Sequence, residues 1–126
     1  MKGLIALPCL ALMLFSTQVS ALCLYISDSY SGLLQPGVET TVYGPFTITS
    51  ANGCAGATID ASASTSGGGR APQLIIQKQA GASWGDVAGT FGGTTSYSGV
   101  FGTYRIVMIN SGSEAQSYSG TARYGR

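Results

Sequence analysis

The segment GTYRIVMI, residues 102–109, is the most apolar strand-like run after residue 21. Its side chains are mostly aromatic, β-branched or long and apolar, which are types that β-strands favour. Alternation places Tyr104 and every second residue after it on a core-facing side, with Arg105 on the opposite side. The run therefore predicts a central strand of a β-structure.

The sequence Gly102-Thr103-Tyr104 opens this run. It resembles the tyrosine corner of Greek-key sandwiches, in which a Tyr hydroxyl bonds to the backbone while its ring packs inward. The resemblance implies that Gly102 and Tyr104 form a structural corner. The alternative is that Tyr104 is an ordinary strand aromatic.

Short apolar runs separated by Gly- and Ser-rich turns fill the rest of the chain after residue 21. Residues 55–64 alternate strictly between small apolar and polar side chains, which predicts a half-buried strand with a thin apolar face. Residues 74–76 are apolar on both faces and predict a central strand, and residues 22–26 predict a first strand. The fold expected is an all-β, antiparallel sandwich of about eight strands with Greek-key or jelly-roll-like connections.

Residues 1–21 have a different character. A short basic end precedes an apolar run, and Val19-Ser20-Ala21 has the small-x-small pattern that signal peptidase favours. We expect a helical secretory signal peptide over residues 1–21, a single sandwich domain over residues 22–126, and a secreted or periplasmic protein. No later apolar run is long enough to cross a bilayer, so no membrane span is expected after signal removal.

The chain has three cysteines, and Cys9 lies in the predicted signal. Cys23 and Cys54 remain, and an oxidising compartment favours a disulfide between them. Such a bridge would be worth about 3–4 kcal/mol in the chain-entropy model. The alternative is a pair of buried free thiols.

Catalytic chemistry has few candidates. The chain contains no His, which removes the commonest general base and the imidazole ligands of zinc. Lys78 is expected at a strand edge or end rather than in a Ser-Lys dyad, and the acidic residues occur singly, without the Asp-x-Asp pattern of a calcium loop. A pair of carboxylates assembled in space stays open. We expect no catalytic residue, no cofactor, no metal site and no enzyme activity.

The balance of charged residues also limits the classes of partner that the protein can bind. Once Lys2 leaves with the signal, basic and acidic residues balance, so there is no basic field to hold nucleic acid. Few lysines remain to guard strand edges, which leaves self-association through sheet edges open.

Aromatic residues are the candidates for contact with a partner. Exposed rings stack on sugars or anchor proteins, so we expect partner-binding residues among Trp84, Tyr97, Tyr43 and Tyr30. Trp84 lies beside a turn, where the alternative is that it caps one end of the core. The function expected is a secreted, non-catalytic β-sandwich that binds an extracellular glycan, a cell-envelope component or a protein. A fibre or coat subunit and a secreted toxin or inhibitor are the alternatives.

Residues 74–124 resemble the bacterial pre-peptidase C-terminal domain. The similarity lies in Leu74-x-Ile76, Trp84-x-x-Val87, Gly102-Thr103-Tyr104-Arg105-Ile106 and Ser117-Tyr118-Ser119-Gly120. It implies a secreted, jelly-roll-like sandwich of the kind appended to exported proteases and other enzymes. Pro72-Gln73 departs from the family, which has an acidic residue before its first apolar strand, and the sequence given carries no enzyme domain.

Overall fold

The computed structural model describes residues 23–66 and 70–126, so the predicted signal peptide lies outside the described residues. Within these ranges the secondary structure is β-strand, with no helix long and apolar enough to cross a membrane. The eight strands are β1 (Tyr25–Leu34), β2 (Glu39–Ile48), β3 (Ala57–Ser66), β4 (Gln73–Ala80), β5 (Ser83–Thr90), β6 (Thr94–Gly99), β7 (Gly102–Ile109) and β8 (Gln116–Gly125).

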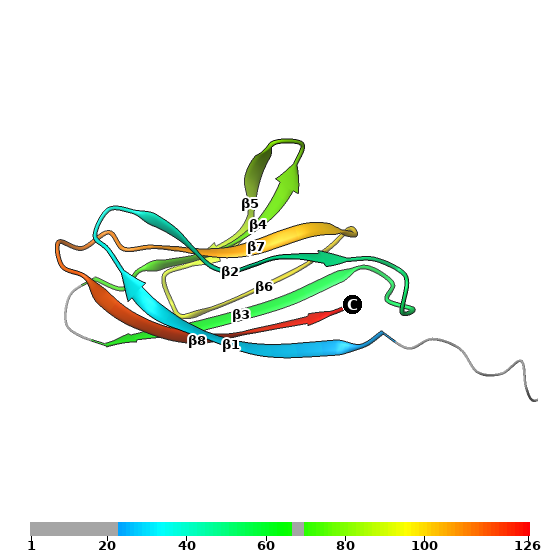
Figure 1. Cartoon of the computed structure of the whole chain (residues 1–126), viewed down its shortest axis with the longest axis horizontal. Coiled ribbons are helices and arrows are strands. Elements are labelled where there is room, and N and C mark those ends of the chain that lie inside the picture. The colour runs from blue at the N-terminus through cyan, green and yellow to red at the C-terminus, as the bar shows by residue number, and fades with distance from the viewer. Residues whose placement is uncertain (1–22, 67–69) are drawn as a thin grey trace, which may run out of the picture.

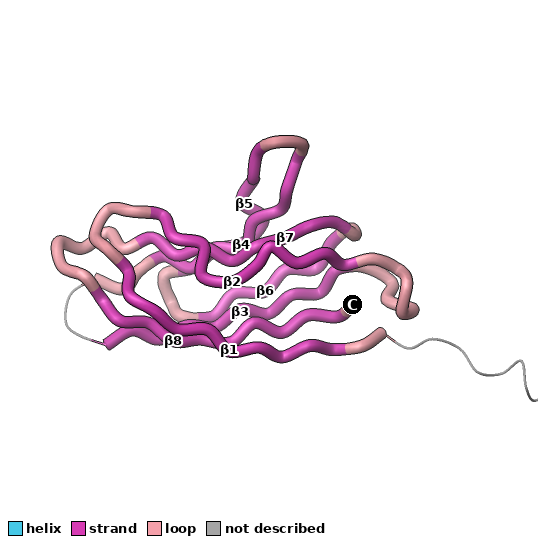
Figure 2. The backbone as a smooth tube through the Cα atoms, in the orientation of Figure 1, coloured by secondary structure: helices cyan, strands magenta, loops and turns pink. Residues whose placement is uncertain are grey.

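The strands form two four-stranded antiparallel sheets, ordered β1-β8-β3-β6 and β2-β7-β4-β5. Figure 1 shows the sheets packed face to face, and Figure 2 shows most of the connecting loops gathered at the two ends. Only β4 and β5 are consecutive strands within one sheet, and every other connection between named strands crosses to the opposite sheet. This is jelly-roll order, and it confirms the predicted all-β sandwich.

The core lies between the sheets, and β7 and β4 contribute much of it. Tyr104, Ile106 and Met108 face the core as predicted, and Leu74 and Ile76 of β4 join them. Opposite them, the inward side of β3 carries mostly alanines, and aromatic rings complete the packing. Phe46 of β2 stacks on Tyr124 of β8 with ring centroids 4.2 Å apart, so aromatic contacts join one sheet to the other.

Three tyrosine rings pack against glycines on strands of the β1-β8-β3-β6 sheet. A Cβ on Gly120 would lie 2.7 Å from ring atoms of Tyr30 and 2.0 Å from the carbonyl oxygen of Ser62. The same relation holds for Gly32 beneath Tyr118 and for Gly99 beneath Tyr97. A glycine is required at these positions because the ring occupies the space that any side chain would need.

The Tyr104 side chain is fully buried, and its hydroxyl donates a hydrogen bond to the carbonyl oxygen of Val100, 2.5 Å away. Its acceptor is four residues upstream, in the turn between β6 and β7. Gly102 lies close to this corner, where a Cβ would be 3.0 Å from Cε of Lys78. The hydrogen bond fixes the turn that leads into the central strand β7.

The observed β1 differs from the sequence-based prediction, and β2 departs from the alternation of a regular strand. β1 begins at Tyr25 and runs to Leu34, whereas residues 22–26 were predicted, because β8 pairs with it along its whole length and overrides the low strand propensity of its Ser and Gly residues. In β2, simple alternation fails around Tyr43, which is flanked by two register shifts, one between Thr41 and Tyr43 and one between Tyr43 and Phe46. Both Val42 and Tyr43 therefore pack against the core.

Cys23 and Cys54 form the predicted disulfide, with their Cα atoms 4.4 Å apart and a sequence separation of 31. The bridge ties the residue just before β1 to the loop that precedes β3. It therefore joins two segments that enter the same sheet without being neighbours in it.

The packing of Tyr30 on Gly120 predicts that Gly120→Ala destabilises the protein by about 1–3 kcal/mol, the usual cost of overpacking. Gly85→Ala is the matched control, because Gly85 also lies in a strand but has no atom within 4 Å of its Cβ position. We expect the control to stay within about 0.5 kcal/mol of wild type in urea unfolding curves. Equal unfolding midpoints for the two variants would contradict the packing described.

The disulfide predicts that Cys23→Ser/Cys54→Ser lowers the free energy of unfolding by about 3–4 kcal/mol, because the denatured chain regains its loop entropy. Guanidinium unfolding of this variant and of wild type measured with and without reductant checks this. The reduced wild type should match the variant, and identical curves for all three samples would show that the bridge contributes nothing.

Candidate functional site

The outer face of the β1-β8-β3-β6 sheet carries an array of small hydroxyl side chains. Successive residues of a strand point to opposite faces, and the inward positions of β1, β3 and β8 are taken largely by tyrosine, alanine, glycine and aliphatic residues. The outward positions in the middle of the sheet are Ser29, Ser31, Ser62, Ser64, Thr94, Ser119 and Thr121. We call this set the hydroxyl face.

Strand register arranges the hydroxyl face in rows that cross the sheet. One row is Ser29, Thr121, Ser62 and Thr94, and the next is Ser31, Ser119 and Ser64. Neighbours within a row are separated by the spacing of adjacent strands, about 4.7–4.9 Å. The face therefore presents hydroxyl groups at intervals fixed by the backbone.

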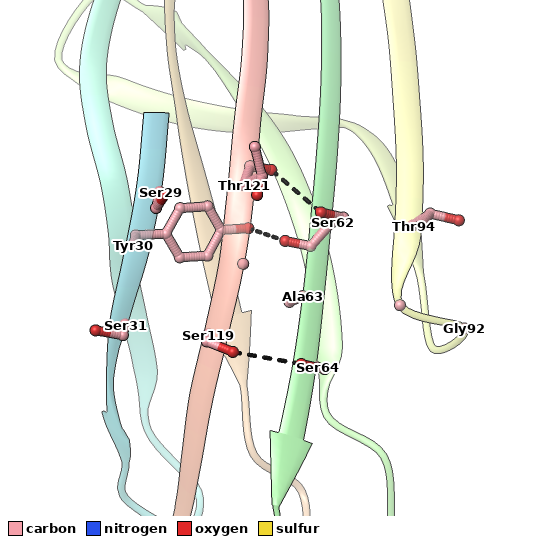
Figure 3. Close-up of a pocket in the computed structure, with 12 residues that line it drawn as sticks. Ser29, Tyr30, Ser31, Ser62, Ala63, Ser64, Gly92, Thr94, Ser119 and Thr121 are labelled. Atoms are coloured by element: carbon pink, nitrogen blue, oxygen red, sulfur yellow. Dashed lines mark hydrogen bonds between the residues drawn. The ribbon is translucent and has the colours of Figure 1, made fainter. Parts of the chain in front are cut away.

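Few strong hydrogen bonds within the protein occupy these hydroxyls. The Ser64 and Ser119 Oγ atoms are 3.4 Å apart, and Ser62 Oγ is 3.5 Å from the carbonyl oxygen of Thr121 (Figure 3). Both distances exceed the ordinary range for O–H···O bonds. A ligand could therefore replace these contacts at little cost.

The centre of the hydroxyl face is hollowed into an open groove of about 750 Å³. The turn at Gly92 and Gly93 borders it (Figure 3), and the Ala63 amide donates to the carbonyl oxygen of Gly93 at 2.8 Å. Gly93 has a φ of +94°, a conformation that L side chains rarely adopt. This glycine lets the turn lie close to β3 and form one side of the groove.

Tyr30 supports the groove from within the sheet. Its ring passes Gly120 of β8, and its hydroxyl donates to the carbonyl oxygen of Ser62 on β3 at 2.5 Å (Figure 3). Only 8% of the residue is exposed, and burial raises the pKa of Tyr30 to about 12. The side chain thus links three strands and keeps the hydroxyl rows in place.

Charged groups lie one row away, at one end of the groove. Asp60 is aligned between Arg123 of β8 and Ser96 of β6, and Ser96 Oγ donates to Asp60 Oδ1 at 2.7 Å. A smaller hollow of about 260 Å³ surrounds these residues and shares Ser62, Thr94 and Thr121 with the groove. A ligand that extends along the sheet would meet the charged hydrogen-bond acceptor Asp60 and the charged donor Arg123 here.

Trp84 lies on the other sheet, in a β4–β5 hairpin whose tip projects from the sandwich (Figure 1). The guanidinium carbon of Arg105 is 4.3 Å from its ring centroid, so Arg105 covers one face of the half-buried ring. Arg105 Nε donates to Gln77 Oε1 at 2.8 Å, and Gln77 Nε2 donates to Asp86 Oδ1 at 2.9 Å. These contacts make Trp84 part of a polar network on the outer face of the second sheet.

The other predicted aromatic residues pack against or within the core. The Tyr43 hydroxyl donates to the Asp28 carboxylate and lies 3.1 Å from the Tyr124 hydroxyl. Burial and the hydrogen bond to Asp28 raise the pKa of Tyr43 above its ordinary value. Tyr97 is half-buried, with its ring centroid 5.7 Å from that of Tyr104.

The structure does not gather the four aromatic candidates on one surface. Tyr30 and Tyr43 lie together, with ring centroids 6.1 Å apart, whereas Trp84 belongs to the other sheet. Sequence reasoning missed the hydroxyl face, although the polar half of the alternation at residues 55–64 was a signal for it. That half contains Ser, Thr and a single Asp where Lys or Glu would be ordinary on a solvated strand.

The hydroxyl face can donate and accept hydrogen bonds, but Ser and Thr hydroxyls have no nearby His to activate them. In the part of the chain that the structure describes, no group of three or more His, Cys, Asp and Glu side chains could hold a metal ion. The groove therefore offers hydroxyl groups that can both donate and accept hydrogen bonds.

No model of a protein family, no curated protein and no solved structure matches this chain.

The raised tyrosine pKa values predict loss of stability in alkali. Burial raises the pKa of Tyr30 and of Tyr104 from 10.0 to about 12. A group whose folded-state pKa is raised contributes stability below its unfolded pKa and loses it as pH rises through the folded value. The unfolding midpoint should thus be flat up to pH 10 and fall between pH 10 and 12, as urea curves and tyrosinate absorbance would show. Ionisation of every tyrosine near pH 10 without loss of stability would contradict this.

Proposed function

We propose that this chain is a secreted, non-catalytic binding module whose hydroxyl face binds a neutral polysaccharide of the extracellular space or cell envelope. The observation that carries the proposal is the groove of about 750 Å³ lined by serine and threonine side chains in register across three neighbouring strands and beside a fourth. The predicted signal peptide and the Cys23–Cys54 disulfide both suit an oxidising, extracytoplasmic compartment.

The chemistry of the groove matches that of a sugar chain. Each serine or threonine hydroxyl is both donor and acceptor, as is each sugar hydroxyl, so paired hydrogen bonds form without burial of charge. The groove is open and crosses exposed strand surface, so an extended polymer can enter it from the side. The side chains stand on a sheet rather than on loops, which lowers the entropy lost on binding.

The resemblance of residues 74–124 to pre-peptidase C-terminal domains points to the same class of secreted, non-catalytic sandwich. β7, which contains one of the four segments of that resemblance, lies inside the β2-β7-β4-β5 sheet. Its role there is structural, and the candidate site lies on the opposite sheet. We therefore base the proposed ligand on the groove and not on the resemblance.

The matched pair Ser119→Arg and Thr47→Arg tests this function. Both residues are exposed strand positions with a hydroxyl neighbour on the next strand, Ser64 for Ser119 at 3.4 Å and Thr103 for Thr47 at 2.9 Å. Ser119 lines the groove, whereas Thr47 lies on the other sheet. Against a panel of neutral glucans, mannans and xylans, Ser119→Arg should weaken calorimetric binding by about tenfold or more, and Thr47→Arg should bind like wild type.

Trp84→Ala gives the test a second arm, since Trp84 is the aromatic candidate remote from the groove. Unchanged binding by this variant, together with loss in Ser119→Arg, supports the hydroxyl face. Loss in Trp84→Ala with normal binding in Ser119→Arg would place the site on the β4–β5 hairpin and overturn the assignment. Absence of binding to the whole panel by the wild-type protein would overturn the polysaccharide proposal itself.

A further inference from the structure

We propose that two copies of this chain associate through antiparallel pairing of their β1 strands, about a two-fold axis centred on Ser29. This inference does not depend on the polysaccharide proposed above, because it concerns the edge of the sheet and not its face.

β1 is an open edge strand. It lies at the end of the β1-β8-β3-β6 order, so no strand of residues 23–66 and 70–126 lies beside the backbone groups on its far side. Its ten residues pair with β8 from Tyr25↔Gly125 to Leu34↔Gln116 without a register shift. The strand contains no Lys, Arg or Pro, the residues with which proteins commonly block such edges.

The other three edges are less suited to pairing. β2 contains Pro45 and two register shifts, which interrupt a regular ladder. β5 has a register shift opposite Ile76 and Gln77, and β6 is only six residues long. β1 is therefore the edge that offers the longest regular row of free backbone groups.

The side chains of β1 favour one register. Pairing about Ser29 sets Tyr25 opposite Leu33 of the second copy, and these are the exposed large apolar residues of the strand, at 70% and 54%. Each dimer would contain this aromatic–aliphatic pair twice, and such cross-strand pairs stabilise a sheet by roughly 0.2–1 kcal/mol each. The exposed side chains of Tyr25 and Leu33 then gain a partner that they lack in the single chain.

The same register avoids a clash of charge. Asp28 is the one charged residue of β1, and it accepts a hydrogen bond from Tyr43 of β2 in its own chain. Pairing about Ser29 sets Asp28 opposite Tyr30 of the second copy, whereas pairing about residue 28 would oppose two carboxylates. If the axis lay between two residues, each core-facing residue of β1 would be set opposite an outward-facing residue of the second copy. The inner and outer faces of the two sheets would then not match.

This arrangement would join two sheets into one, in the order β6-β3-β8-β1-β1-β8-β3-β6. Because the two-fold axis is perpendicular to the sheet, both hydroxyl faces would lie on the same side. The contact is narrow, so we expect a reversible dimer that forms with increasing concentration rather than an obligate one.

Sedimentation equilibrium of the mature protein from about 10 μM to about 1 mM tests the association. We expect the average mass to rise toward that of a dimer for wild type and to stay monomeric for Tyr25→Lys/Leu33→Lys, which sets like charges opposite each other. Val38→Lys/Val100→Lys is the control, because these exposed apolar residues (50% and 64%) lie outside β1, and it should dimerise like wild type. A wild-type chain that stays monomeric, or association unaffected by the β1 variant, would overturn the proposal.

The register is tested by charge reversal and by cross-linking. Tyr25→Lys/Leu33→Glu sets opposite charges against each other only when position 25 faces position 33 of the second copy. This variant should therefore regain the dimer that Tyr25→Lys/Leu33→Lys loses. In the proposed register Ser29 faces its own copy at a Cα separation of about 4.5–5.5 Å, which a disulfide can span. Ser29→Cys should therefore cross-link under oxidation and Ser31→Cys should not. Equal cross-linking of both variants, or no rescue by charge reversal, would exclude this register.

Discussion

Close contact between tyrosine rings and glycine backbone is the interaction on which the rest of this sandwich depends. Tyr30 packs on Gly120, and Tyr118 packs on Gly32 of the strand paired with it. Each ring fills the space above a residue that has no side chain, so two bulky aromatic rings fit side by side on the paired strands β1 and β8. The rings then reach the opposite sheet, where Tyr43 and Phe46 meet Tyr30 and Tyr124.

This inward packing also explains the character of the two outer surfaces. On the β1-β8-β3-β6 sheet the inner side takes most of the large groups, and the middle of the outer side carries mainly serine and threonine. On the β2-β7-β4-β5 sheet the outer side is filled, because Val107 is fully buried there without belonging to the main core, and Arg105, Gln77 and Trp84 interact above the strands. One outer surface is thus lined mainly by small hydroxyl side chains, while the other is covered by larger side chains that contact one another.

The fold could be predicted from sequence wherever a strand's pattern is local. Residues 55–64 and 102–109 each show their alternation within a single strand, and the structure places their inward faces as expected. The length of β1 could not be predicted, because its Ser and Gly residues become a strand only through pairing with β8, nearly a whole chain length away. The environment of Tyr43 is a further case, because the register shifts on either side of it arise in the pairing of β2 with β7 and not in a local pattern.

The candidate site was harder to predict than the fold for the same physical reason. Exposure of an aromatic ring depends on distant partners, such as Gly120 beneath Tyr30 and Arg105 over Trp84, and no local pattern reports them. Serine and threonine in alternation look like ordinary solvated strand residues until cross-strand register aligns them into rows.

The most direct measurement of the central claim is an amide chemical-shift titration of isotope-labelled protein with a soluble neutral polysaccharide. The account predicts that the largest shifts fall on the central residues of β1, β8 and β3 around Ser62 and Ser119, with little change in the β4–β5 hairpin. Shifts confined to the hairpin around Trp84, or no shifts at saturating polysaccharide, would contradict it.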